Sequence, residues 1–311
     1  MRILIVGAGA IGGYFGGRLA QNGADVTFLV RPTRQRQLRE TGLTIRSRHG
    51  DFNGPVHAIC SGESAKPFDL LILAVKAYHL KQAMEDVRPY VGDSTAILPL
   101  LNGYTHFEQL TKAFGADKVL GGLCFIEATL DRQGEIVQTS ERHDLVFGEW
   151  DGSRTGRAET ILSHLQRAHF NVTLSENVQT DIWHKYIFIT GMSGITTLMQ
   201  APIGPILTNA HGNATYEKLI RELVSIARHI GAPVAEDAAR KTLTTTEACH
   251  YDMKSSMQRD MEKHLPVEAD HLQGAWLSLA VENGADLAEF PVLTAVYANL
   301  KIYEAMLDDS C

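Results

Sequence analysis

The chain has 311 residues, of which 44% are hydrophobic and 21% charged, and its formal net charge is −7. Single hydrophobic cores stop growing near about 250 residues, so this length predicts two domains. The composition is that of an ordinary globular protein, and the acidic balance argues against a nucleic-acid partner.

Short apolar runs alternate with helical segments up to about residue 177. The runs RILIVG, DVTFLV, DLLILAV and TAILPLL are almost continuously apolar, which is typical of parallel strands buried on both faces. Their alternation with helices predicts an α/β fold with a Rossmann-type, doubly wound parallel sheet. Four further strands are expected to extend or edge the same sheet, in VLGGLCFIEATL, GEIVQT, DLVFGEW and NVTLSE.

The pattern changes at about Val178. From there to the end of the chain, apolar residues recur at intervals of three and four, which predicts an all-helical domain. The expected domains are therefore residues 1–177 and 178–311, packed closely with a cleft between them.

A glycine-rich turn follows the first predicted strand. Its spacing is G-x-G-x-x-G, and it lies between a strand and a helix. The first glycine of this motif permits a tight turn, the second lets the backbone approach a pyrophosphate, and the third lets helix and strand pack closely. We assign dinucleotide binding to Gly7, Ala8, Gly9, Ala10, Ile11 and Gly12. A glycine-rich turn without a ligand is the alternative.

The residue after the second strand selects the nucleotide. NAD-binding proteins usually place an acidic residue there to hold the ribose 2′-hydroxyl, but this strand runs into Arg31, and no acid follows before Glu40. A guanidinium can bind a 2′-phosphate through charge-assisted hydrogen bonds. The sequence therefore favours NADP(H) over NAD. Arg34 remains open, and Arg36 and Arg39 fit a solvated helix face.

Two polar positions follow later strands of the predicted sheet, where ligands bind in open α/β folds. Lys76 can meet a phosphate or a substrate carboxylate, and Asn102 can hold the nicotinamide or the substrate. A surface lysine and an ordinary Asn-Gly turn are the alternatives.

The helical half contributes Lys185, within an apolar, aromatic-flanked segment where a charge is costly unless function requires it. Partial burial would suit this lysine to donate a proton, and a lysine that extends to solvent is the alternative. Glu268 follows Pro266 at an expected helix start, where an acid can also be simply a favourable first-turn charge.

Metal and redox sites are not predicted. The 13 histidines include no H-x-x-x-H spacing, and the four cysteines form no C-x-x-C pair. The apolar stretches are too short to span a bilayer. We expect a cytoplasmic protein with no metal and no membrane partner. The helical half leaves a homodimer open.

The order of these features resembles the ketopantoate reductase (2-dehydropantoate 2-reductase) family over nearly the whole chain. The resemblance rests on GAGAIGG, the arginine after the second strand, AVKAYHLKQA, LLNGYTHFEQL, WHKY, SSMQRDMEKHLPVEADHLQG and FPVLTAVYANLK. It implies NADPH-dependent reduction of a 2-keto acid to a 2-hydroxy acid, the step that makes pantoate for pantothenate and coenzyme A.

The resemblance also implies roles for particular residues. Lys185 matches the general acid and Glu268 the acid that anchors the substrate. Ser256 and Ser193 match substrate-binding positions. Lys76 and Asn102 match residues where cofactor and substrate meet, and the cofactor set then includes Arg31, Lys76, Asn102 and Glu268.

Three positions depart from the family pattern. Typical members carry asparagines four and eight residues after the lysine, on the same helix face, where this chain has Ile189 and Ser193. Gln273 replaces a further asparagine. A lost hydrogen-bond partner costs about 1–3 kcal/mol of substrate discrimination. Ketopantoate is therefore the leading substrate, with another branched 2-keto acid as the alternative. A non-catalytic NADP-binding sensor is the alternative from another class.

Overall fold

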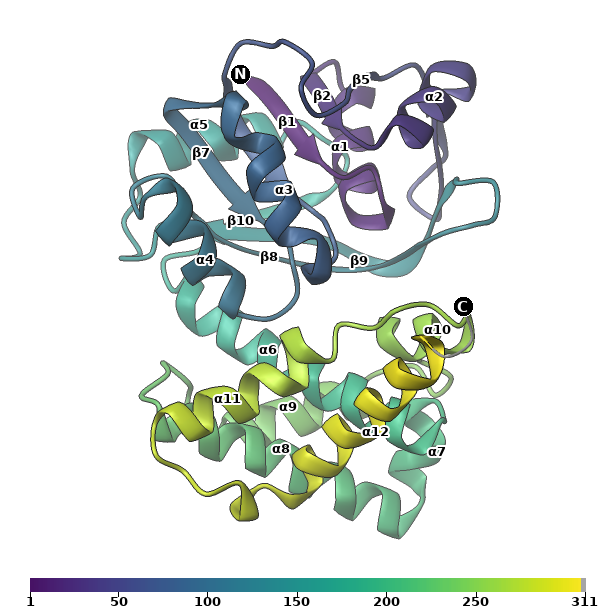
Figure 1. Ribbon diagram of the computed structural model, residues 1–311, viewed down its shortest axis with the longest axis vertical. Helices are drawn as coiled ribbons and strands as arrows, with labels where there is room; N and C mark the ends of the chain where they lie inside the picture. Colours follow the sequence, from purple (N-terminus) through teal and green to yellow (C-terminus); the bar gives the residue numbers. More distant parts are fainter. Residues whose placement is uncertain (309–311) are drawn as a thin grey trace. The chain divides into compact units, whose positions relative to one another are not determined.

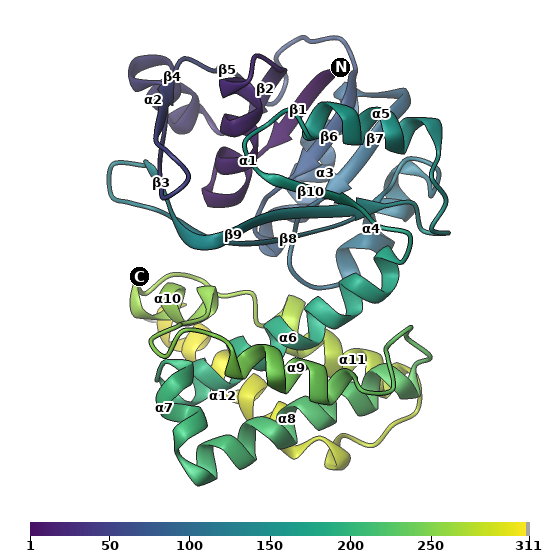
Figure 2. The same cartoon turned by 180° about the vertical axis from the view of Figure 1, so that it is seen from behind.

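The computed structural model describes residues 1–308 (Figures 1 and 2). The chain divides into two compact units. The first contains Met1–Leu101 and His106–Val178, and the second contains Asn102–Thr105 and the residues from Gln179 on. The segment Asn102–Thr105, which follows the last strand of the first sheet, thus belongs by its contacts to the second unit.

The first unit contains a five-stranded sheet in the order β5-β2-β1-β6-β7, in which every neighbouring pair is parallel. Its strands are β1 (Arg2–Val6), β2 (Asp25–Leu29), β5 (His57–Ile59), β6 (Phe68–Leu73) and β7 (Val91–Pro99). Ile3 to Ile5 and Leu70 to Leu73 are fully buried. The predicted Rossmann-type parallel sheet is confirmed.

The later strands form a second sheet of their own, so the expectation that they extend the first sheet is wrong. Its order is β10-β9-β3-β4, with β8 paired to β9. Its strands are β3 (Leu43–Ser47), β4 (Phe52–Gly54), β8 (Gly121–Leu130), β9 (Ile136–Gly148) and β10 (Asn171–Leu174). The runs GEIVQT and DLVFGEW, expected as two strands, belong to the single strand β9, which lies beside β8 as a long ribbon (Figure 2).

Helix α1 (Ala10–Gln21) separates the two sheets. A Cβ atom on Gly16 would lie 2.7 Å from the Phe28 ring of the first sheet, and one on Gly13 would lie 2.5 Å from Ile136 of the second. The helix needs glycine on both sides because both sides pack against strands. The other helical elements of this unit are α2 (Pro32–Thr41), η1 (Ala77–His79), α3 (Leu80–Val87), η2 (Arg88–Tyr90), α4 (Thr105–Phe114) and α5 (Gly156–Leu165).

The second unit is helical from α6 onward, as predicted for the C-terminal half. Its elements are α6 (Val178–Met199), α7 (Ile203–Thr208), α8 (Ala210–His229), α9 (Ala238–Glu247), α10 (Ser256–Glu262), η3 (Asp270–Gly274), α11 (Ala275–Glu282), η4 (Leu287–Glu289) and α12 (Pro291–Asp308). Its core includes the fully buried Tyr216 and Trp276. Among the described helices, none combines the length and apolar character that crossing a membrane requires.

Candidate active site

The glycine loop (residues 7–12) joins β1 to α1 and has a different constraint at each glycine. Gly7 has φ of +95°, and its N–H donates to the Leu29 carbonyl at 3.0 Å. A Cβ atom on Gly12 would lie 2.1 Å from the Gly7 carbonyl oxygen, whereas one on Gly9 would have no heavy atom within 4 Å. The turn and the packing therefore require the outer glycines, and the middle glycine leaves open space beside the backbone.

The amino end of α1 suits an anion. Its N-cap residue is Gly9, so no side chain caps the first turn, and that turn contains no acidic residue. The first N–H groups of a helix have no partner within the helix and, with the helix dipole, attract negative charge. The loop can thus hold the pyrophosphate of a dinucleotide.

Arg31 lies two residues after the end of β2, on one side of the glycine loop. Its Nη2 is 3.1 Å from each nitrogen of the His79 ring, which belongs to η1 after β6. Burial and the nearby Arg31 charge lower the pKa of His79, which favours the neutral form of the ring. Lys76 is the N-cap residue of η1 and is partly buried. Because β1 lies between β2 and β6, these side chains flank the loop.

Arg34, whose role the sequence does not decide, contacts backbone groups of the protein. Its Nε donates to the Ala8 carbonyl at 3.2 Å, and its Nη1 donates to the Gly134 carbonyl at 2.9 Å. Burial lowers its pKa. The side chain thus ties the glycine loop to the turn between β8 and β9.

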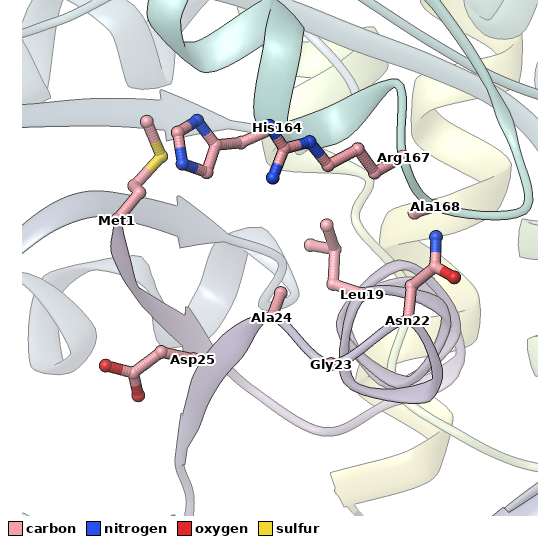
Figure 3. A pocket seen from close by; sticks show the side chains of 9 residues that line it. All are labelled: Met1, Leu19, Asn22, Gly23, Ala24, Asp25, His164, Arg167 and Ala168. Atoms are coloured by element: carbon pink, nitrogen blue, oxygen red, sulfur yellow. The ribbon is translucent and has the colours of Figure 1, made fainter.

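A hollow on the first unit lies at the opposite edge of the parallel sheet (Figure 3). Met1 and Asp25 stand at the amino ends of β1 and β2, and His164 and Arg167 come from α5 and the residues after it. None of the predicted site residues lines it. Ligands of such sheets bind at the carboxyl ends of the strands, where the glycine loop lies.

In the second unit, α6 carries Lys185, Ile189 and Ser193 at intervals of four residues, on one side of the helix. Lys185 is only 7% exposed. Burying an ammonium group is costly, so this position favours a functional reason for the charge.

The turn η3 comes two residues after Glu268 and is hydrogen-bonded to α6. It is π-helical, with the Gly274 N–H donating to the Ala269 carbonyl at 2.9 Å, and such turns occur frequently at functional sites. The Tyr186 hydroxyl donates to the Leu272 carbonyl at 2.9 Å. The Lys185 helix and the Glu268 segment are thereby held together.

Two of the three departures from the family pattern contact each other. The amide nitrogen of Gln273 donates to the Ser193 hydroxyl at 2.8 Å and to the Thr190 carbonyl at 3.3 Å. Both side chains are buried. The longer amide at 273 reaches the shorter hydroxyl at 193, so the Ser193 oxygen already serves a protein contact. Ile189 is partly buried and packs against the helical core.

The two serines at the start of α10, Ser255 and Ser256, differ in burial and in what they contact. Ser255 is buried, caps the helix by accepting the Gln258 N–H at 3.0 Å, and lies 2.8 Å from the Thr196 hydroxyl of α6. Ser256, which the resemblance assigns to the substrate, is exposed, and its role stays a prediction. The contact of Ser255 with α6 was not predicted from the sequence.

His271 was also missed. Its ring nitrogens contact the Asn102 carbonyl and the Thr105 hydroxyl, both in the segment after β7. Tyr104 of the same segment stacks on Trp183 of α6, with ring centroids 4.3 Å apart. An isolated histidine gives no sequence signal, although its position three residues after Glu268 was visible.

Comparisons with known proteins identify the family of the chain. The family model described as "Ketopantoate reductase PanE/ApbA" matches residues 3–152, and the model of the C-terminal part of that family matches residues 177–304. An uncharacterized oxidoreductase of Bacillus subtilis (strain 168), YkpB, is 47% identical over 98% of this chain and 99% of its own.

Two solved structures show the same fold. The crystal structure of 2-dehydropantoate 2-reductase from Geobacter metallireducens GS-15 matches with a TM-score of 0.87 and 28% identity, over 97% of this chain and 99% of the other. A D-mandelate dehydrogenase in ternary complex with NADH and anilino(oxo)acetate matches with a TM-score of 0.89 and 21% identity, over 99% and 100% of the two chains. The glycine loop, the helical unit and these matches over both parts of the chain show that it is an oxidoreductase of the ketopantoate reductase PanE/ApbA family.

Proposed function

We propose that the protein is an NADPH-dependent reductase of a branched 2-keto acid, with ketopantoate as the leading substrate and pantoate, the precursor of pantothenate and coenzyme A, as the product. The observation that carries the proposal is the buried Lys185 on α6, the helix to which the turn after Glu268 is hydrogen-bonded. Family membership and the anion-binding geometry of the glycine loop support it.

The first unit supplies the nucleotide-binding groups. Residues 7–12 would hold the pyrophosphate, and Arg31 would bind the 2′-phosphate that distinguishes NADP(H) from NAD(H). The bound cofactor provides a hydride for the carbonyl carbon of the substrate. Lys76 would contact cofactor and substrate where the two meet, and the same role is proposed for Asn102, which belongs by its contacts to the second unit.

The second unit supplies the acid. The Lys185 ammonium stabilises the negative charge that develops on the carbonyl oxygen and then transfers its proton to that oxygen. Glu268 anchors the substrate, and Ser256 and Ser193 are the further substrate-binding positions in this proposal. We further propose that the protein binds no metal, has no nucleic-acid or membrane partner and is cytoplasmic. A homodimer is proposed as its possible assembly.

A different branched 2-keto acid is the second candidate, because Ile189 cannot hydrogen-bond and Ser193 is engaged by Gln273. The D-mandelate dehydrogenase shares the fold, which agrees with the fold serving other 2-oxo acids. A non-catalytic NADP sensor is the third candidate, and the retention of both Lys185 and Glu268 argues against it.

The test measures NADPH oxidation with ketopantoate and a panel of branched and aromatic 2-keto acids, repeated with NADH. Ketopantoate with NADPH should be the best pair. Lys185→Ala should lower kcat by about 10²- to 10⁴-fold, whereas Lys112→Ala, which removes an exposed lysine of α4, should not. If the enzyme prefers another 2-keto acid, that acid replaces ketopantoate as the proposed substrate. Tight NADPH binding without turnover of any acid would favour the sensor.

A further inference from the structure

The ring of His271 connects η3 with both ends of the segment Asn102–Thr105. Its Nε2 lies 2.7 Å from the Asn102 carbonyl oxygen, and its Nδ1 lies 3.2 Å from the Thr105 hydroxyl. A carbonyl oxygen can only accept a hydrogen bond, so Nε2 must carry the proton. In the neutral ring, Nδ1 then accepts from the Thr105 hydroxyl. One imidazole therefore holds a four-residue segment at two points.

The surroundings keep this ring neutral. Burial lowers the pKa of His271, and the nearby Glu268 charge and the bond to Asn102 oppose that effect only in part. A neutral imidazole has one donor and one acceptor, and this pair can make both contacts. The backbone carbonyl thereby selects the tautomer.

The shape of the segment is matched to the ring. Gly103 has φ of +96°, and a Cβ atom there would lie 2.8 Å from the His271 Nε2. Only glycine allows both this backbone conformation and the close approach of the imidazole. The stacking of Tyr104 on Trp183 fixes the middle of the segment to α6.

His271 also belongs to the turn that follows Glu268. The Leu272 N–H donates to the Glu268 carbonyl at 3.0 Å, and the Leu272 carbonyl accepts the hydroxyl of Tyr186, the residue beside Lys185. The Asn102 segment, the Glu268 segment and the Lys185 helix therefore all meet at η3.

We propose that His271 is a positioning residue of the reductase, which holds Asn102 in place for cofactor and substrate by bonding the Asn102 carbonyl and the Thr105 hydroxyl. This inference rests on the proposed function. The imidazole does not take part in proton transfer to the substrate. It fixes the backbone on which a polar side chain of the site is mounted.

The test compares His271→Leu, which removes both contacts, with His271→Gln, whose amide can still donate to the Asn102 carbonyl. A displacement of about 1 Å at a reacting group can cost about 10²-fold in rate, so we expect kcat of His271→Leu to fall by about 10- to 100-fold. His271→Gln should recover most of the loss, and Thr105→Val should give an intermediate one. His229→Leu removes another histidine that bonds a backbone carbonyl, that of Asn283, and should leave kcat unchanged.

Each outcome separates the inference from the proposed function. Normal kcat in His271→Leu, with Lys185→Ala inactive, would overturn the role of His271 and leave the reductase assignment standing. A lower unfolding midpoint in both His271 variants, with no change of kcat per folded enzyme, would show a structural role only and would also overturn it. If the unaltered protein reduces no keto acid, the proposed function and this inference both fail.

Discussion

The glycine loop and the α6–η3 region (α6, η3 and the segment Asn102–Thr105) organise polar groups in opposite ways. The loop is six consecutive residues between β1 and α1, and a Cβ atom on its Gly12 would lie 2.1 Å from the carbonyl oxygen of its own Gly7. The α6–η3 region is assembled from distant segments, since His271 meets Asn102 across 169 positions and Gln273 meets Ser193 across 80. A short sequence motif specifies the local geometry of the loop, whereas the residues of a site assembled by packing are distributed along the chain.

The largest expected effect tests the local half of this comparison. In Gly12→Ala the new Cβ would lie 2.1 Å from the Gly7 carbonyl oxygen, so the loop must move. Overpacking of this kind costs about 1–3 kcal/mol or more, and NADPH binding should fall at least tenfold. Titration calorimetry measures the affinity and thermal unfolding measures the stability.

Gly9→Ala is the matched control, because its Cβ would meet no heavy atom of the protein within 4 Å. It should leave the unfolding midpoint nearly unchanged and weaken only NADPH binding, through contact with the ligand. Equal destabilisation by the two substitutions would contradict the different roles assigned to these glycines.

An effect on nucleotide affinity without loss of stability is expected beside the loop, where two arginines differ in what they contact. Charge-assisted hydrogen bonds contribute about 1.5–3 kcal/mol, so Arg31→Ala should weaken NADPH binding by about 10- to 100-fold and change NADH binding little. Arg34→Ala should weaken both nucleotides alike, because Arg34 bonds the Ala8 and Gly134 carbonyls. Equal losses of NADPH and NADH affinity in Arg31→Ala would exclude its assignment to the 2′-phosphate.

The parts of the fold that were predictable from the sequence are those with a short repeat. Continuous apolar runs identified the four long strands of the parallel sheet, and spacing of three and four residues identified the helical half. The strands β3 to β5 were not predicted, because β4 and β5 have only three residues each and β3 alternates apolar with polar residues instead of forming a continuous apolar run. The second sheet depends on pairing between distant strands, such as β3 with β9, and apolar runs do not specify which strands pair.

The same limit applies to the candidate site. The glycine loop, Arg31, Lys76 and Asn102 were found because each follows a strand. His271 and Ser255 were missed because their partners lie elsewhere in the sequence and become visible only when η3, α10 and α6 are packed. The residues of an assembled site can be proposed from a family pattern, but their partners come from the structure.

The smallest effect concerns the pair that this chain has in place of two asparagines. Gln273→Asn withdraws the amide from the Ser193 hydroxyl, and leaving a buried polar group without its partner costs about 1–3 kcal/mol. Ser193→Asn instead inserts a larger side chain against Gln273. The double variant restores the combined length, so its loss of stability in urea unfolding should be less than the sum of the two single losses, by about 0.5–3 kcal/mol.

The double variant also tests why the substrate-binding positions differ from the family pattern. Ser193 bonded to Gln273 has less capacity to bind a substrate, whereas an asparagine pair has additional donors and acceptors. The variant should therefore raise kcat/KM for ketopantoate relative to 2-keto acids with apolar tails. Additive stability losses together with an unchanged preference would mean that positions 193 and 273 act independently. Ile189, which is the departure without a compensating partner among the described contacts, would then be the residue that sets substrate choice.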